Sequence, residues 1–358
     1  MSVTPCISQL NSNSFSENNR YFDSLNLVYK QKKLDTLFTY LATKRAFNGA
    51  ILIAQSDTIF FQNVSGYTNF TTKEPLNLHA SFEIGSMSKM FTAVSVLLLY
   101  EQGKIDVSKK VSDYIPDFPY SEITVHQLLC HRSGLPEYFS FAEKYHKNSS
   151  FPLTNDSLLL MLQKHKPKCS IEPDNEFEYN NTGYAVLASI VEKVSGMTFK
   201  HFLDTNIFEP LGMKETFLYQ YGSQQEIMLG HKGNKKVYPR NFLSGVVGDK
   251  GVFSSVNDLY LWDKALFSGK IIKKQTLALA CAPHNSDKNP CNNYGYGLHI
   301  GCTGNNQPLL YHGGLWNGNH SLFVHRPSDG TLIIILSNIY NKSFMWKSYN
   351  ILHILDEL

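Results

Sequence analysis

The apolar positions near both ends of the chain form the short, bounded runs that are typical of β-strands. Residues 49–56 and 58–66 are rich in apolar and β-branched side chains, and the pair Ser56-Asp57 separates them, which predicts a β-hairpin. Further runs of this kind follow near the C-terminus, at 294–302, 307–312, 320–326 and 331–338. The sequence Pro-Ser-Asp-Gly at 327–330 predicts a tight turn between the last two runs. Both ends of the chain are therefore expected to supply strands.

Helical spacing of apolar residues is found just inside each terminus. Residues 21–45 have an apolar pattern that predicts an amphipathic helix. The apolar residues that define it are Leu27, Leu34, Phe38 and Leu41. A second helix is predicted over about 343–358. Residues 1–20 are polar and rich in Asn and Ser, which predicts a disordered or loosely attached N-terminal segment.

Between the two β-rich ends, residues 82–279 show mainly helical periodicity and loops bounded by Gly and Pro. A chain of 358 residues exceeds the usual size of a single core, so two structural lobes are expected. We expect residues 21–81 and 280–358 to form an antiparallel sheet lobe flanked by the terminal helices. Residues 82–279 would form an inserted, mainly helical lobe. The predicted fold class is α/β, in the α+β sense.

Composition and charge narrow the possible classes of function. The chain is 42% hydrophobic and 18% charged, as is usual for a globular protein. Its formal net charge is only +3 and its basic clusters, 30–33 and 273–274, are short, so we expect no nucleic-acid partner. The longest apolar run, 90–100, is about half of the roughly 20 residues that span a membrane, so no integral membrane segment is expected. The oligomeric state cannot be read from these properties.

The N-terminal residues and the spacing of the cysteines bear on the compartment and on the cofactors of the protein. Residues 1–20 lack the basic and apolar regions of a signal peptide, so we expect a periplasmic or secreted protein only if a leader was removed, and a cytoplasmic one otherwise. The six cysteines include no Cys-x-x-Cys pair and have no close His partners, so no metal site and no cofactor are expected. A bridge among Cys281, Cys291 and Cys302 stays open if the compartment is oxidising.

The strongest chemical signal is Ser86, followed three residues later by Lys89 at the start of the apolar run. A serine hydroxyl becomes a good nucleophile only when a base takes its proton. Positions three apart on a helix share one face, so the amine would lie within reach of the hydroxyl. An amine among apolar side chains loses hydration, which lowers its pKa and lets it act as a base. By itself, this spacing also fits a serine that caps an ordinary helix.

Two more segments occur in a compatible order along the chain. The first contains Tyr179 and Asn181, and the second contains His312, Gly313 and Gly314. With these motifs the chain resembles the penicillin-recognising serine hydrolases, namely class C β-lactamases, D-alanyl-D-alanine peptidases and related esterases. That family carries Ser-x-x-Lys, then Tyr-x-Asn, then Lys or His followed by a small residue and Gly. The likeness covers nearly the whole chain and implies the β-lactamase/transpeptidase-like fold. It also implies that the active site lies at the seam between the two lobes, where ligand clefts tend to form.

The resemblance also implies a role for each matching residue. Ser86 would be the nucleophile of an acyl-enzyme, and Lys89 or Tyr179 would take its proton; which of them is the base stays open. A tyrosine can be a base near neutral pH only beside positive charge, which Lys89 would supply. Asn181 would hold Lys89 and donate to a substrate carbonyl. The oxyanion would lie between the backbone N–H groups of Ser86 and Leu315, the latter directly after the third motif.

The third motif departs from many β-lactamases and peptidases of the family, which carry Lys in place of His312 and a hydroxyl residue in place of Gly313. Lysine is a permanent cation suited to a substrate carboxylate, whereas histidine is mostly neutral at pH 7. We therefore predict an esterase or a peptidase, acting on a small-molecule ester, amide or peptide, rather than a true β-lactamase. The choice among ester, D-peptide and β-lactam stays open. The alternative is a non-catalytic sensor that captures penicillin or another acyl ligand.

Overall fold

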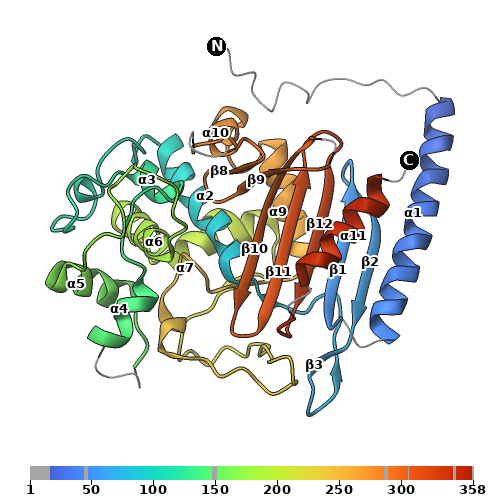
Figure 1. Ribbon diagram of the computed structural model, residues 1–358, viewed down its shortest axis with the longest axis horizontal. Coiled ribbons are helices and arrows are strands. Elements are labelled where there is room, and N and C mark those ends of the chain that lie inside the picture. Colours follow the sequence, from blue (N-terminus) through green and yellow to red (C-terminus); the bar gives the residue numbers. More distant parts are fainter. Residues whose placement is uncertain are drawn as a thin grey trace.

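Strands from both ends of the chain form one antiparallel sheet (Figure 1). The computed structural model describes residues 17–43, 47–146, 151–285, 289–304, 306–341 and 344–356. The strands of the main sheet are β1 (Gly49–Gln55), β2 (Thr58–Ser65), β8 (Asn292–Tyr294), β9 (His299–Cys302), β10 (Pro308–Trp316), β11 (Asn319–Arg326) and β12 (Thr331–Ser337). Their order across the sheet is β2-β1-β12-β11-β10-β9-β8. Because β1 pairs with β12, the N-terminal hairpin joins the C-terminal strands, as predicted.

Turn residues decide where these strands begin and end. Ser56 and Asp57 have φ values of 47° and 63°, the left-handed pair typical of a two-residue hairpin turn, so the predicted hairpin is confirmed. The single strand predicted over 294–302 is wrong, because the chain reverses between β8 and β9. Gly297, with a φ of 78°, lies in that reversal, and a Cβ there would lie 2.9 Å from the backbone oxygen of Lys89. Glycine therefore lets this turn approach the segment that carries Lys89.

The two terminal helices, α1 (Glu17–Thr43) and α11 (Phe344–Asp356), lie together on one face of the sheet (Figure 1). Apolar side chains from these helices and from the facing strand positions form one hydrophobic cluster, which includes Leu34, Phe38, Ile51, Ile333 and Ile351. Both predicted terminal helices are thus confirmed. The expectation of a loose segment over 1–20 is wrong for residues 17–20, which belong to α1, and residues 1–16 lie outside the described residues.

The helical part of the chain packs against the opposite face of the sheet (Figure 1). Its helices are α2 (Ser88–Glu101), α3 (Val125–Leu129), α4 (Tyr138–Tyr145), α5 (Asn155–His165), α6 (Asn181–Ser195), α7 (Phe199–Leu203), α8 (Glu209–Leu211), α9 (Val256–Ser268) and α10 (Lys274–Ala280). The short strands are β3 (Tyr67–Asn69) and β4 (Glu74–Pro75), which pair together, and β5 (Phe82–Glu83), β6 (Phe217–Leu218) and β7 (Val252–Ser254), which form a small second sheet.

One hydrophobic cluster joins the helical part to the main sheet, and its members include Phe91, Leu187, Trp262 and Ile334. Helix α9 packs directly on β1 and β12, although it lies inside the range 82–279 that was assigned to the helical lobe. The core is therefore continuous across the two parts of the chain. We keep the division into a sheet lobe, 21–81 with 280–358, and a helical lobe, 82–279, as a proposal.

A disulfide bond joins Cys291 and Cys302 where β8 pairs with β9 at the edge of the main sheet. This is one of the pairings left open among three cysteines, and Cys281 lies outside the bridge. Within the described ranges, no helix combines the length and the apolar character needed to cross a membrane. The same residues contain no group of three or more His, Cys, Asp or Glu side chains placed to hold a metal ion.

Candidate active site

Ser86 lies in a 3-10 turn, η1 (Gly85–Met87), that leads directly into α2. Gly85 has a φ of 52°, a left-handed conformation that glycine adopts at no steric cost. Strand β10 lies close against this turn, since a Cβ on Gly85 would be 2.9 Å from the backbone nitrogen of Leu315. The structure therefore brings the backbone of Leu315 next to the turn that carries Ser86, as the predicted pair of oxyanion donors requires.

Lys89 lies one helical turn after Ser86 and is fully buried, whereas Ser86 is partly exposed. Its Nζ donates to Ser86 Oγ at 3.2 Å, to Asn181 Oδ1 at 2.8 Å and to the backbone oxygen of Asp249 at 3.0 Å. Burial lowers the pKa of Lys89 to about 8, although the carboxylates of Asp249 and Glu137 oppose this shift. With this pKa, about a tenth of the amine is uncharged at pH 7, and the lone pair of that form can accept the Ser86 proton.

The Ser86 side chain lies close enough to the Tyr179 phenol to favour its ionised form and so to oppose the rise of its pKa. The Nζ atom of Lys89 lies 4.8 Å from the centre of the Tyr179 ring. Desolvation raises the pKa of Tyr179 above its ordinary value of 10. The nearby amine therefore does not turn Tyr179 into a phenolate, which a tyrosine base near neutral pH would require. At neutral pH, Tyr179 keeps its proton and can donate it.

Asn181 is the first residue of α6, a helix capped by Asn180, whose side-chain oxygen accepts from the backbone N–H of Gly183 at 2.9 Å. The Oδ1 atom of Asn181 accepts from Lys89, as expected of a residue that holds the amine. Its Nδ2 and backbone N–H both donate to Glu137 Oε2, at 3.0 Å and 2.8 Å. Because a carboxylate can only accept, this contact fixes the orientation of the Asn181 amide. The Nδ2 group predicted to meet a substrate carbonyl thus has a protein partner.

His312 is buried on β10, and its ring centre lies 6.4 Å from that of Tyr179. Its Nδ1 donates to the backbone oxygen of Gly313 at 2.7 Å, so Nε2 is left to accept from the Tyr294 hydroxyl at 3.1 Å. Burial, reinforced by the neighbouring His299, holds the pKa of His312 well below its ordinary value. The imidazole is therefore neutral, and it lacks the charge that a lysine would carry here.

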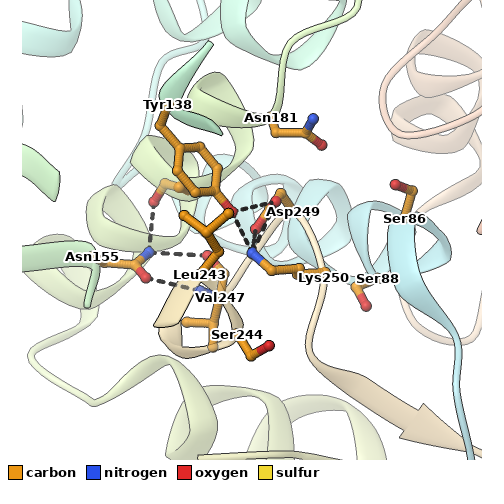
Figure 2. Close-up of polar contacts among 12 residues, drawn as sticks. Ser86, Ser88, Tyr138, Asn155, Asn181, Leu243, Ser244, Val247, Asp249 and Lys250 are labelled. Atoms are coloured by element: carbon orange, nitrogen blue, oxygen red, sulfur yellow. Dashed lines mark hydrogen bonds and ion pairs between the residues drawn. The ribbon is translucent and has the colours of Figure 1, made fainter. Parts of the chain in front are cut away.

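Charged residues that the sequence did not point to complete the surroundings of the amine. Glu137 holds Asn181, and the buried pair Asp249 and Lys250 lies in the loop 248–251 before β7. Figure 2 shows Lys250 beside the Asp249 carboxylate and the hydroxyl of Tyr138. In the sequence, Asp249 and Lys250 stand between two glycines, and a charged pair in that setting more often lies in a solvent-exposed turn.

The Ser86 hydroxyl, the Lys89 amine and the Tyr179 phenol thus lie close together, an arrangement that suits a serine hydrolase working by acyl transfer. The chain belongs to the Beta-lactamase family, whose profile matches residues 34–354. It is similar to penicillin-binding protein 4* of Bacillus subtilis, with 32% identity over 86% of this chain and 72% of that protein. It is also similar to a D-aminopeptidase of Brucella anthropi, with 24% identity over 75% of this chain and 52% of that protein.

Solved structures show the same architecture. The penicillin binding protein from Bacillus halodurans superposes with a TM-score of 0.76, covering 89% of this chain and 98% of that one at 24% sequence identity. This likeness confirms the predicted β-lactamase/transpeptidase-like fold. The family membership identifies the protein as a serine hydrolase of the β-lactamase and penicillin-binding-protein type.

Proposed function

We propose that the protein hydrolyses a small ester or amide through an acyl-enzyme on Ser86. The observation that carries this proposal is that the buried Lys89 amine donates to the Ser86 hydroxyl at 3.2 Å and lies 4.8 Å from the centre of the Tyr179 ring. Lys89, as the free amine, takes the proton while Ser86 Oγ forms a bond to the substrate carbonyl carbon. The oxyanion produced accepts hydrogen bonds from the backbone N–H groups of Ser86 and Leu315.

Collapse of this intermediate breaks the bond to the leaving group. Tyr179 gives its proton to the leaving oxygen or nitrogen and regains one from the Lys89 ammonium, so the site returns to its starting charge. Water then attacks the acyl carbon while Lys89 takes a proton from it. The Lys89 ammonium returns that proton to Ser86 Oγ as the bond to the acyl carbon breaks, which releases the carboxylic acid and restores the alcohol. We assign the base to Lys89 because its pKa is about 8, whereas the pKa of Tyr179 lies above 10.

The substrate is proposed to be a neutral acyl compound rather than a penicillin-like acid. His312 supplies no charge for a substrate carboxylate, and Gly313 supplies no hydroxyl donor. The likeness to a D-aminopeptidase supports amides and peptides beside esters as substrates. Asn181, with its Nδ2 bonded to Glu137, is assigned to holding Lys89.

A substrate panel tests this proposal. Short p-nitrophenyl esters, D-amino-acid amides and nitrocefin are to be compared by kcat/KM, and we expect the esters to be cleaved fastest and nitrocefin poorly. Nitrocefin outrunning every ester would show that the inference from His312 and Gly313 is wrong. A stable adduct with labelled penicillin, without steady-state turnover of any member of the panel, would favour the non-catalytic sensor instead.

The pH dependence of hydrolysis should report the amine beside Ser86. Below the pKa of Lys89, about 8, the amine is charged and cannot accept a proton, so kcat/KM is expected to fall about tenfold for each pH unit. Above that pKa, kcat/KM should reach a plateau. Initial rates with p-nitrophenyl acetate across this range, corrected for spontaneous hydrolysis, give the profile. A plateau that extends to about pH 6 would contradict Lys89 as the base.

A further inference from the structure

Lys250 occupies an unusual environment for a lysine. Its side chain is only 3% exposed, and that of Asp249 only 1%. Its Nζ donates to the Tyr138 hydroxyl and lies 3.3 Å from both oxygens of the Asp249 carboxylate. The Tyr138 hydroxyl in turn donates to Asp249 Oδ2 at 3.0 Å, which closes a three-membered network (Figure 2). A buried ammonium with such partners keeps its charge only while the carboxylate stays beside it.

Aromatic rings enclose the rest of this ammonium. The Nζ atom lies 4.9 Å from the centre of the Trp316 ring and 5.6 Å from that of Phe139, and these two rings stack at 5.4 Å. Ring faces attract a cation and exclude water from it. Trp316 follows Leu315, the proposed oxyanion donor, so Lys250 lies next to the candidate active site without facing solvent.

Asp249 connects Lys250 to the amine of the site. Its backbone oxygen accepts from Lys89 at 3.0 Å, while its carboxylate binds Lys250. One residue thus contacts both lysines, and its negative charge is shared between them. If Lys250 were absent, the whole charge of the carboxylate would act on Lys89.

We propose, resting on the function proposed above, that Lys250 is a positioning residue for the reaction at Ser86: it holds the Asp249 carboxylate away from Lys89, so that the amine can act as a base. The purely structural alternative is that Lys250 only fixes the loop 248–251.

Other titratable groups surround Lys89, but none of them compensates the charge of the Asp249 carboxylate as Lys250 does. Glu137, before α4, is the second carboxylate that acts on it. Near Lys250 itself, the buried Glu83 of β5 is paired with Arg240. The remaining groups near Lys89 are Tyr179, Tyr184, His131, His299 and His312, and desolvation keeps all of them neutral at pH 7.

The test compares the pH profile of kcat/KM for p-nitrophenyl acetate in the full chain and in Lys250→Met, whose side chain is similar in length but uncharged. Removal of the ammonium leaves the Asp249 carboxylate uncompensated, and this favours the charged form of Lys89. The acid limb is expected to move up by about one pH unit, which lowers kcat/KM at neutral pH about tenfold. An active variant with an unmoved limb would overturn the proposal, since loss of loop structure alone lowers activity at every pH.

A second variant, Asp249→Asn, tests the proposal independently. It also serves as the test if Lys250→Met does not fold. Loss of the carboxylate should move the limb to lower pH. The double variant Asp249→Asn/Lys250→Met should follow Asp249→Asn, because Lys250 loses its charge together with the carboxylate. A limb that moves up or stays in Asp249→Asn contradicts the proposal. Thermal unfolding and fluorophosphonate labelling of Ser86 at high pH identify the folded variants. If Ser86→Ala hydrolyses the ester as fast as the unaltered protein, the proposed function fails. That result is distinct from a failure of the proposal on Lys250, which is seen only in the position of the acid limb.

Discussion

Ser86→Ala is expected to lower kcat for ester hydrolysis by about 10⁴-fold or more, because no other group can form the acyl-enzyme. The side chain is the point where Lys89 and Tyr179 converge, and its removal leaves both without the atom that they serve. Incubation of the unaltered protein with a fluorophosphonate, followed by mass spectrometry of the peptides, should locate one adduct on Ser86. Ser86→Ala should show no adduct. Its turnover should be close to the uncatalysed rate, with only the small excess that substrate binding alone supplies.

A matched control lies on the same helix. Ser95 is also buried on α2, but its hydroxyl donates to the backbone oxygen of Phe91 at 2.8 Å. Ser95→Ala should therefore keep both the adduct and the activity. Retained hydrolysis in Ser86→Ala, together with an adduct on a different residue, would refute the assignment of the nucleophile.

The fold could be predicted from the sequence wherever local pattern and tertiary packing agree. Apolar and β-branched runs indicated β1, β11 and β12, because helices cover the sheet on both faces there. The partly exposed strands β2 and β10 were indicated by the same kind of run. The run 294–302 misled because its apolar residues continue through a reversal that depends on Gly297 packing against α2. Helix α9 shows the same limit, since periodicity reveals an apolar face but not the sheet that it covers.

For the site, the ordered motifs indicated which side chains would meet, and the structure brings Ser86, Lys89, Tyr179 and Asn181 together. The charged residues that tune the amine could not be found in this way. Lys250 and Tyr138 are 112 positions apart, and their contact depends on how the loop before β7 packs. The burial of His312 and its bond to Tyr294 could not be predicted either, since both arise only from the pairing of β8 to β10.

Gly314→Ala is expected to lower kcat about 100-fold or more and to reduce stability, because it forces β10 away from the turn that carries Ser86. A Cβ on Gly314 would lie 1.9 Å from the backbone oxygen of Ile84 and 2.3 Å from the hydroxyl of Ser321. Ile84 immediately precedes η1, so the contact with its oxygen cannot yield without moving backbone. The Ser321 hydroxyl can yield only by giving up its 2.6 Å hydrogen bond to the same oxygen. The measurement is kcat for a short ester, with thermal unfolding followed in parallel.

Gly313→Ala is the matched control for this prediction, because it adds the same methyl group one residue earlier. The nearest atom to a Cβ on Gly313 is the backbone oxygen of Ser321 at 3.7 Å, an ordinary van der Waals contact. This variant should therefore fold and keep kcat within a few-fold of the unaltered protein, about the range of ordinary surface changes. The contrast between neighbours isolates the position of Leu315 N–H, since only the strand shift at Gly314 removes it from Ser86. Equal kcat values in the two variants would mean that the oxyanion is not held by β10.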